Sequence, residues 1–177
     1  ISFPEILQTN HKNLPVGEIK LSDSQLSELL NLPDDHSYTR VALLGVYAIK
    51  ELLKKSGYEN FPQDTGFISG TSVGGIDKTE QHFYNYQNQP ELDKYIQAQH
   101  PGFTTEKIAE YFGLKGFVTT ISTACSSSAN TIMMGARMIN SGKLKRVIVG
   151  GSDSLTNFTL NGFNSLKILS ENKACPF

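Results

Sequence analysis

Apolar positions in the first third of the chain repeat at helical intervals. From Ser37 to Gly57 they recur at steps of three and four residues, which predicts an amphipathic helix packed against a sheet or another helix. A shorter helix is expected to begin after Ser22, because Ser22 and Gln25 form a capping-box pattern ahead of several leucines. This helix is expected to end before Pro33. The residues before this helix contain prolines, asparagines and a glycine, and are expected to form extended loop and turns.

Further along the chain, three short apolar runs predict strands, at 66–70, 117–122 and 147–151. Small and apolar residues fill 124–141, so a helix is expected there. Its apolar character on most sides predicts an interior position. A strand, a helix and a strand within about forty residues imply a right-handed parallel crossover. The predicted fold class is therefore α/β.

The region between the first two predicted strands is more polar. A glycine-rich bend at 71–75 is expected to open a helix. The residues 77–95 predict that helix followed by an exposed excursion, because few of them are apolar. A short amphipathic helix is expected at 105–112, with Gly113 as its stop signal.

Composition narrows the classes of function. Sixteen Lys and Arg residues against 17 Asp and Glu residues give a formal net charge of −1, whereas nucleic-acid binding usually requires a clear basic excess. No apolar run approaches the ~20 residues of a membrane span. The two cysteines, Cys125 and Cys175, lack the paired spacing of zinc or dithiol sites. We therefore expect no metal site, no membrane span and a reducing, cytoplasmic location.

The ends of the chain predict a part of a longer protein. The first residue is Ile1 rather than a methionine or a secretory signal, and the chain stops at Phe177 in a predicted loop. We therefore expect residues 1–177 to form a partial domain that is truncated at both ends. A domain cut in this way exposes apolar surface, so poor solubility or association is expected unless a partner covers that surface.

Cys125 is the first candidate for chemistry. A β-branched strand leads to it, small residues at 126–129 leave room around it, and a helix follows. At a helix N-terminus, unpaired N–H groups and the positive end of the helix dipole favour the thiolate, which is the nucleophilic form of cysteine. The backbone N–H of Cys125 is also a candidate donor to an oxyanion. The alternative is that Cys125 is a small apolar residue in a core.

Ser72 is a second nucleophile candidate. Residues 70–74 match the G-x-S-x-G pattern of the α/β-hydrolases, between a predicted strand and a predicted helix. That chemistry also needs an acid and then a histidine well downstream. Only His82 and His100 follow, both in the polar region soon after the bend, so a serine hydrolase is a remote alternative. The glycines also allow a tight turn or a close approach of the backbone.

The chain resembles a known family in four segments, in the same order: GTSVGG at 70–75, TACSSSA at 123–129, GGSD at 150–153 and GFNSLK at 162–167. They are similar to motifs in the N-terminal half of the β-ketoacyl-acyl-carrier-protein synthases of the elongating, condensing type. The resemblance implies a thiolase-like αβαβα layered fold, of which only part of the N-terminal half is present. It also implies an acyltransferase of fatty acid or polyketide biosynthesis. Cys125 would take an acyl group from acyl carrier protein, and a carbanion from malonyl-carrier protein would then attack the thioester.

The resemblance also implies binding residues. Gly74, Gly75 and Thr79 would bind substrate, since the stretch after the bend often lines the acyl pocket in this family. Phe163 would lie near the acyl tunnel, or else pack in the core. Lys167 matches a basic position that helps dock the acidic carrier protein, although a lone lysine is also typical of solvated surface. No bound cofactor is implied, because phosphopantetheine of the carrier protein holds the substrates. A homodimer or a ketosynthase-like heterodimer is expected.

Two further expectations limit the activity. In this family two histidines and a lysine of the C-terminal half complete the site, so the chain alone is expected to be inactive. The histidines present match no family motif: His11, His36, His82 and His100. The alternative is a non-catalytic partner subunit that shapes chain length, although such subunits typically lose the cysteine. The polar stretch 76–80 predicts a short or unusual acyl substrate, since apolar pockets gain about 0.8 kcal/mol per buried CH2. Cys175 is expected to be unreactive.

Overall fold

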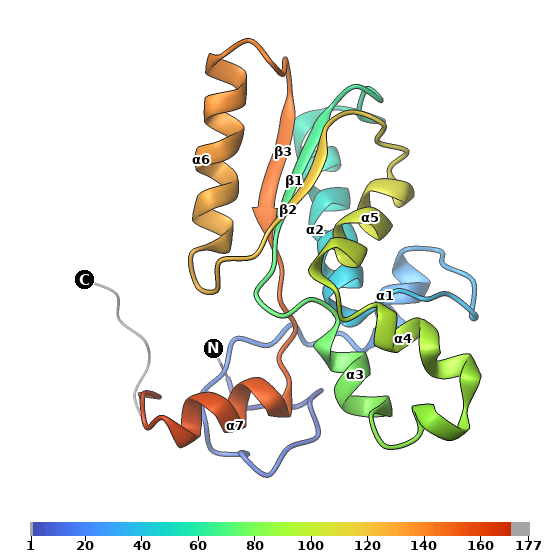
Figure 1. The fold of residues 1–177 in the computed structure, drawn as a ribbon, viewed down its shortest axis with the longest axis vertical. Helices are drawn as coiled ribbons and strands as arrows, with labels where there is room; N and C mark the ends of the chain where they lie inside the picture. Colours follow the sequence, from blue (N-terminus) through green and yellow to red (C-terminus); the bar gives the residue numbers. More distant parts are fainter. Residues whose placement is uncertain (1, 171–177) are drawn as a thin grey trace.

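A parallel sheet of three strands forms the centre of the computed structural model, which describes residues 2–170. β1 (Gly66–Gly70) lies between β2 (Val118–Ile121) and β3 (Val147–Gly151), and both neighbours run parallel to it. Helices lie on both sides of the sheet (Figure 1). The predicted α/β class is therefore confirmed, and each predicted strand is present with its ends within one residue.

Two layers of helices enclose the sheet. α2 (Arg40–Ser56) and α5 (Pro101–Tyr111) cover one face, and α6 (Ser127–Asn140) covers the other (Figure 1). The remaining elements are α1 (Asp23–Leu29), α3 (Ile76–His82), the 3-10 turns η1 (Tyr86–Asn88) and η2 (Pro90–Leu92), α4 (Asp93–Gln97) and α7 (Asn157–Ser165). Within residues 2–170 no helix combines the length and the hydropathy that a membrane crossing requires.

The apolar core lies between the sheet and the layer formed by α2 and α5. Leu43, Val46 and Ile49 of α2 meet Phe67 of β1 and Ile108 of α5, and each of these side chains is at most 8% exposed. The helix is confirmed, but the side that it buries was predicted only in part. Of the apolar positions expected to pack, Val41, Leu44, Ala48, Ile49, Leu52 and Leu53, the structure buries Val41 and Ile49 and leaves Ala48 and Leu52 exposed. Each buried side chain of this size contributes roughly 1.5–3 kcal/mol.

The ends of the helices follow capping chemistry. α1 has the predicted capping box. α2 begins at Arg40 rather than near Ser37, because the side chain of Thr39 caps it. α5 begins earlier than predicted, since His100 caps the helix and Pro101 suits its first position. The exposed excursion predicted after α3 contains the two 3-10 turns and the short helix α4.

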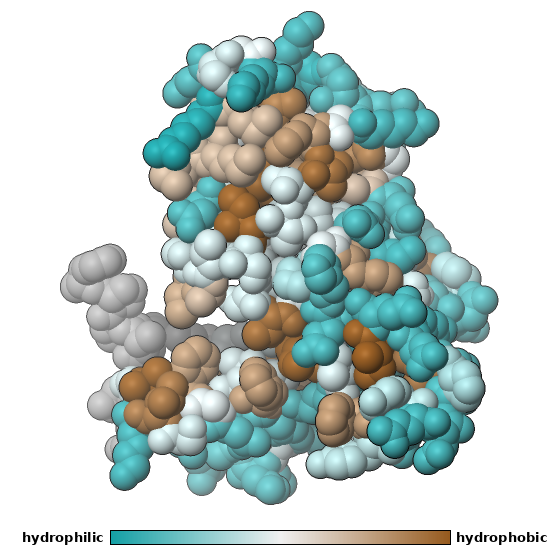
Figure 2. Space-filling model, viewed as in Figure 1, coloured by the Kyte–Doolittle hydropathy of each residue, from teal (hydrophilic) through white to brown (hydrophobic). Residues whose placement is uncertain are grey.

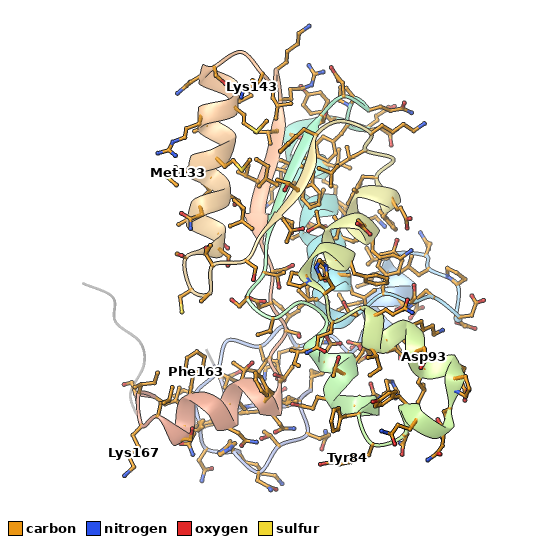
Figure 3. All side chains as sticks on the ribbon, in the orientation of Figure 1. Tyr84, Asp93, Met133, Lys143, Phe163 and Lys167 are labelled. Atoms are coloured by element: carbon orange, nitrogen blue, oxygen red, sulfur yellow. The ribbon has the colours of Figure 1, made fainter. Side chains whose placement is uncertain are left out.

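α6 differs most from expectation, because it begins at Ser127 and is not enclosed by the described residues. Its buried residues are Ser127, Thr131 and Gly135, and these small residues let α6 lie close to β1 and β3. The opposite side is exposed: Ile132 by 58%, Met133 by 44% and Ile139 by 38%. Figure 2 shows apolar residues gathered where α6 lies, and Figure 3 shows Met133 pointing outward. The predicted interior position is therefore not reached within residues 2–170.

Glu18 holds the predicted N-terminal loop together. Its side chain is 2% exposed, and its carboxylate accepts the N–H groups of Glu5, Ile6 and Leu7 at 2.7 to 3.1 Å. It also pairs with Lys20 at 2.9 Å. Burial alone would raise the pKa of Glu18. The ion pair and the three N–H donors outweigh burial and lower this pKa from 4.5 to about 2.

This loop is expected to loosen in acid. Because the folded pKa of Glu18 lies below its unfolded value of 4.5, its stabilising effect is present above pH 4.5 and is lost as the pH falls through about 2. The effect corresponds to about 3 kcal/mol at neutral pH. Glu18→Gln should remove most of it together with its pH dependence. Hydrogen exchange at the amides of residues 5–7 measures both.

The matched control is Glu5→Gln, since Glu5 is also a partner of Lys20 but its side chain is 65% exposed. This change should leave the three amides protected at neutral pH, because exposed ion pairs contribute little. Equal protection in Glu18→Gln and the unaltered protein at neutral pH would contradict the role given to Glu18.

Candidate functional site

The three strands end at the same edge of the sheet. Gly70 of β1 is in register with both Ile121 of β2 and Gly151 of β3. The loops that follow these strands therefore meet at this edge. In parallel α/β sheets the carboxyl ends of the strands are where binding sites form. Both nucleophile candidates, Cys125 and Ser72, lie in these loops.

Cys125 lies in the turn between β2 and α6, and its side chain is exposed and free of a disulfide. The preceding Ala124 has a φ of +51°, a left-handed conformation that residues other than glycine rarely adopt. Strained turns of this kind cluster at functional sites. Ser127 holds the turn, because its Oγ accepts the N–H of Thr123 at 2.9 Å and donates to the Ala124 carbonyl at 2.7 Å. Cys125 therefore does not fill a core position.

Further hydrogen bonds tie this turn to the first turn of α6. Asn130 donates from Nδ2 to Thr123 Oγ1 at 2.9 Å, and Ser126 donates from Oγ to the Thr123 carbonyl at 2.8 Å. These bonds join residues on either side of Cys125, so the position of the cysteine is fixed relative to α6. The positive end of the α6 dipole lies beside it, which favours an anionic group there. The predicted order of strand, cysteine and helix is confirmed, with α6 starting two residues after Cys125.

Asp153, in the loop after β3, links the loops of the other two strands. Its carboxylate accepts the Thr71 hydroxyl at 2.6 Å and the N–H of Ser72 at 2.8 Å. Ser72 in turn touches the cysteine turn, since its Oγ donates to the Ala124 carbonyl at 3.4 Å. The Ser72 carbonyl accepts from Ser122 Oγ at 3.4 Å. One carboxylate therefore connects the loops of all three strands around the cysteine.

Asp153→Ala is expected to loosen this arrangement. It leaves the Ser72 N–H and the Thr71 hydroxyl without their acceptor, so we expect a loss of about 2 kcal/mol in unfolding free energy. Acyl transfer to Cys125, which the resemblance implies, should slow about tenfold, because the reacting groups are less well held. Asp153→Asn keeps one acceptor oxygen and should lie between the two. Thermal unfolding and single-turnover acylation measure these effects.

Asp34→Ala, at an exposed loop position, is the control for the loss of a carboxylate. It should change neither measurement. If Asp153→Ala behaved like Asp34→Ala in both, Asp153 would not hold the loops in the way described.

An apolar pocket of about 520 Å³ opens beside Cys125. One wall is α7, and the opposite wall consists of the three loops; the large apolar residues on the two walls are Phe158, Phe163, Leu166 and Val73. Figure 2 shows the molecule hollowed between the lower end of α6 and α7. A cavity of this size and character suits a small apolar group. The free thiol therefore faces a space that can accept an acyl chain.

Phe163 lies in this pocket and is 39% exposed, so it does not pack in the core. Figure 3 shows its ring on the side of α7 that faces α6. Lys167 follows the end of α7, has a φ of +55° and extends on the opposite side of the helix (Figure 3). Its position is exposed and away from the pocket, and its role in docking a carrier protein stays a prediction.

Three other predicted substrate-binding residues lie outside this pocket. Gly74 has a φ of +56° and lies against the backbone of Gln99, while Gly75 lies against that of Ala98. Thr79 is 8% exposed, and its buried hydroxyl has no hydrogen-bond partner among the described residues. The two glycines therefore allow a close approach of backbone segments in this structure. Substrate binding by these three residues stays a prediction.

The polar residues of α3 are used inside the molecule. Asp77 accepts the N–H of Arg40 at 2.9 Å and the Ser154 hydroxyl at 3.4 Å, and Lys78 pairs with Asp23 at 3.0 Å. Burial raises the pKa of Asp77 above its usual value, although the Arg40 N–H and Lys78 oppose this. Because α3 does not line the pocket beside the cysteine, its polarity no longer argues for a short or unusual acyl chain.

The histidines lie away from both nucleophiles. Each has another role among the described residues: a bond to Asn161 for His11, a bond to Ser27 for His36, stacking on Tyr95 for His82 and a helix cap for His100. The hydroxyl of Ser72 donates to a backbone carbonyl instead of to a histidine. Residues 2–170 therefore provide no base for a serine hydrolase at Ser72. Cys175 lies outside the described residues.

Some residues of the site were not predicted. Phe158 and Leu166 also line the pocket. Leu166 lies three residues after Phe163, a spacing that places both on one side of a helix, and this signal was available in the sequence. The roles of Asp153 and Asn130 depend on partners in other elements or turns. No local sequence pattern predicts such contacts.

The layered α/β fold is that of the thiolase-like ketosynthases, which supply the structural matches. A family model described as "Beta-ketoacyl synthase, N-terminal domain" matches residues 22–177. The chain therefore belongs to the beta-ketoacyl synthase family, and the resemblance found in the sequence is confirmed.

Two of the curated relatives that cover most of this chain come from bacteria. The chain is 27% identical over 175 residues to the tetracenomycin polyketide synthase ketoacyl synthase alpha subunit of Streptomyces glaucescens, covering 92% of this chain and 39% of the relative. It is 26% identical over 165 residues to nodulation protein E of Rhizobium meliloti, covering 85% of this chain and 41% of the relative. The chain therefore spans about two fifths of the length of these relatives.

Solved structures show the same fold. A ketosynthase in complex with its chain length factor, from Xenorhabdus doucetiae, matches with a TM-score of 0.62 and 32% identity, over 91% of this chain and 40% of that chain. The ishigamide ketosynthase/chain length factor matches with a TM-score of 0.69 and 18% identity, over 80% of this chain and 37% of that chain. The second likeness concerns the fold alone.

Proposed function

We propose that the protein is an acyltransferase that lengthens an acyl chain by decarboxylative condensation, with Cys125 as its nucleophile. The observation that carries this proposal is the position of Cys125. The thiol is exposed on a strained turn at the N-terminus of α6, and it borders an apolar pocket of about 520 Å³. The helix terminus favours the thiolate, and the pocket has room for the acyl chain.

The reaction has two covalent stages. In the first, the Cys125 thiolate attacks the carbonyl carbon of an acyl thioester, and the carrier thiol leaves with a proton. In the second, a malonyl thioester loses its carboxylate as CO2, and the electron pair moves to the α-carbon. This carbon attacks the acyl carbonyl, the bond to Cys125 breaks, and the thiolate is restored. The backbone N–H of Cys125 is the proposed donor to the oxyanion.

Acyl carrier protein is the proposed source of both substrates, which its phosphopantetheine would carry, so no bound cofactor is required. Lys167 is the proposed docking contact because it is a basic residue at an exposed position just after α7, the helix that forms one wall of the pocket. A cationic side chain there would attract the acidic surface of a carrier protein. Because dissolved ions screen attraction between exposed charges, the affinity of docking should fall as the salt concentration rises.

The site needs further residues to complete a condensation. Two histidines from outside residues 2–170 are proposed as the groups that stabilise the decarboxylation step. The exposed side of α6 is proposed as the surface against which this further part packs, since it presents Ile132, Met133 and Ile139. A second ketosynthase-like chain is the proposed partner, because two similar structures are complexes with a chain length factor.

The test is product formation by the full-length protein. It should convert an acyl carrier thioester and a malonyl carrier thioester into a β-ketoacyl thioester and CO2, with one CO2 for each product. Release of free fatty acid without a condensation product would favour a hydrolase. If neither product forms although the thioesters bind, the non-catalytic partner subunit becomes the better account.

A further inference from the structure

One wall of the cysteine pocket is a helix with little support from the core. α7 packs extensively against no other helix or strand among residues 2–170, and Leu160 is its buried residue. Two of its pocket-facing side chains are largely exposed, Phe158 by 60% and Leu166 by 66%. The position of α7, and with it the width of the pocket, therefore depends on the few polar contacts that hold it.

Glu80 of α3 makes the strongest of these contacts. Its carboxylate accepts the N–H of Asn157 at 3.2 Å and the N–H of Phe158 at 2.6 Å. These are the first two residues of α7, whose N–H groups have no acceptor within the helix. Thr156 serves the next N–H group, that of Thr159. A carboxylate at this end also meets the positive pole of the helix dipole.

The N-terminal loop provides a second, weaker support on α7. Asn157 donates from Nδ2 to the Gln8 carbonyl at 2.9 Å, and His11 Nε2 lies 2.7 Å from Asn161 Oδ1. Asn157 and Asn161 do not line the pocket beside Cys125, so neither contact lies on the pocket side of α7. Figure 1 shows the N-terminal segment running beside α7 while α7 stands apart from the sheet.

We infer that Glu80 is a positioning residue that sets the acyl-chain selectivity of the Cys125 pocket by holding α7 in place. Glu80 itself does not line the pocket. Its effect passes through the two N–H bonds to the start of α7, and the helix then carries Phe158, Phe163 and Leu166 to their places on the wall. This inference rests on the proposed function, because selectivity is defined for acyl transfer to Cys125.

The same contact gives the charged residue Glu80 of α3 a structural role. The neighbouring Asp77 bonds Ser154, two residues before the N-cap of α7, so α3 holds the whole connection into α7 from one side. Substitution of an apolar residue at Glu80 would leave two N–H groups of α7 without an acceptor. The polar residues Glu80 and Asp77 of α3 therefore support the α7 wall of the pocket, and they do not form the pocket surface.

The experiment compares Glu80→Ala, Glu80→Gln and the unaltered full-length protein over acyl carrier thioesters from acetyl to dodecanoyl. In the unaltered protein, kcat/KM for acylation of Cys125 should peak at the chain length that fills the pocket. Glu80→Ala should lower this peak about tenfold through KM, while the acetyl substrate changes by less than about twofold. Glu80→Gln keeps one acceptor oxygen and should show about a threefold loss.

Hydrogen exchange gives a second measurement that does not require catalysis. In Glu80→Ala the amides of residues 157–166 should exchange faster, while those of α6 keep their protection. Alkylation of Cys125 by iodoacetamide should stay within about twofold of the unaltered protein, since this small reagent does not use the α7 wall. Glu106→Ala, an exposed glutamate within α5, is the matched control and should change none of these measurements.

The outcomes separate the two proposals. A chain-length profile in Glu80→Ala that runs parallel to that of the unaltered protein overturns the role of Glu80 in selectivity, even if all rates fall. If the unaltered protein takes up no acyl group, the proposed function fails, and selectivity by Glu80 fails with it. Hydrogen exchange in α7 that is the same in Glu80→Ala overturns the structural part of the inference in either case.

Discussion

Cys125→Ala should lower β-ketoacyl product formation by at least about a thousandfold, because the intermediate of the proposed reaction is a thioester on this sulfur. The variant should fold normally. The side chain is exposed, and the turn is held by Ser127, Ser126 and Asn130 and not by the sulfur. Product formation and thermal unfolding of the full-length protein are the measurements.

Cys175→Ala is the control for this prediction, since Cys175 is the other cysteine of the chain and has no predicted role. It should retain the full rate of product formation. A Cys125→Ala variant that keeps more than about a tenth of the rate would contradict covalent catalysis by this residue.

Gly74→Ala should destabilise the protein by about 3 kcal/mol, the largest effect on stability that we expect from a single methyl group. The φ of Gly74 is +56°, which costs an alanine roughly 1–2 kcal/mol. An added Cβ would also overlap the carbonyl oxygen of Gln99, which belongs to the backbone and cannot rotate away. The bend that carries Ser72 and Val73 would have to shift. Chemical denaturation measures the change.

Gly57→Ala separates strain from overlap. Gly57 also has a positive φ, of +74°, but a Cβ there meets nothing within 4 Å. This variant should lose only about 1 kcal/mol, the cost of the backbone conformation alone. Equal losses for the two variants would mean that the close approach of Gly74 to the Gln99 backbone has no energetic weight.

Local patterns were sufficient to predict most of the fold. The apolar runs of β1 and β3 and the helical spacing of apolar residues in α2 were each visible in a short window of sequence. Which side of α2 is buried was predicted only in part, since apolar residues lie on several sides of this helix. Helix starts were predicted less well where a residue outside the stripe caps the helix, as Thr39 and His100 do. The prediction that α6 is buried was wrong for residues 2–170. An apolar helix pattern shows that a face packs against something, but it does not show which segment packs there.

The candidate site was predicted in part for a similar reason. Cys125 was chosen as the nucleophile candidate because a strand, the cysteine and a helix are adjacent in the sequence, and Phe163 was chosen because it belongs to a motif. Asp153 and Glu80 act across 81 and 77 positions, on Ser72 and Asn157, and such contacts exist only after the sheet has brought the loops together. The polar residues of α3 were therefore assigned to the pocket surface. In the structure Glu80 and Asp77 instead bond α7 and the segment before it, and neither lines the pocket.

The central claim is that an acyl group passes through Cys125, and peptide mapping of the acylated protein tests it most directly. The full-length protein is incubated with an acyl carrier thioester, digested and analysed by mass spectrometry with and without neutral hydroxylamine, which cleaves thioesters. We predict the acyl mass on the peptide that contains Cys125, and its loss on treatment with hydroxylamine. An acyl group on Ser72 or Cys175, or no acylated peptide at all, would contradict the account.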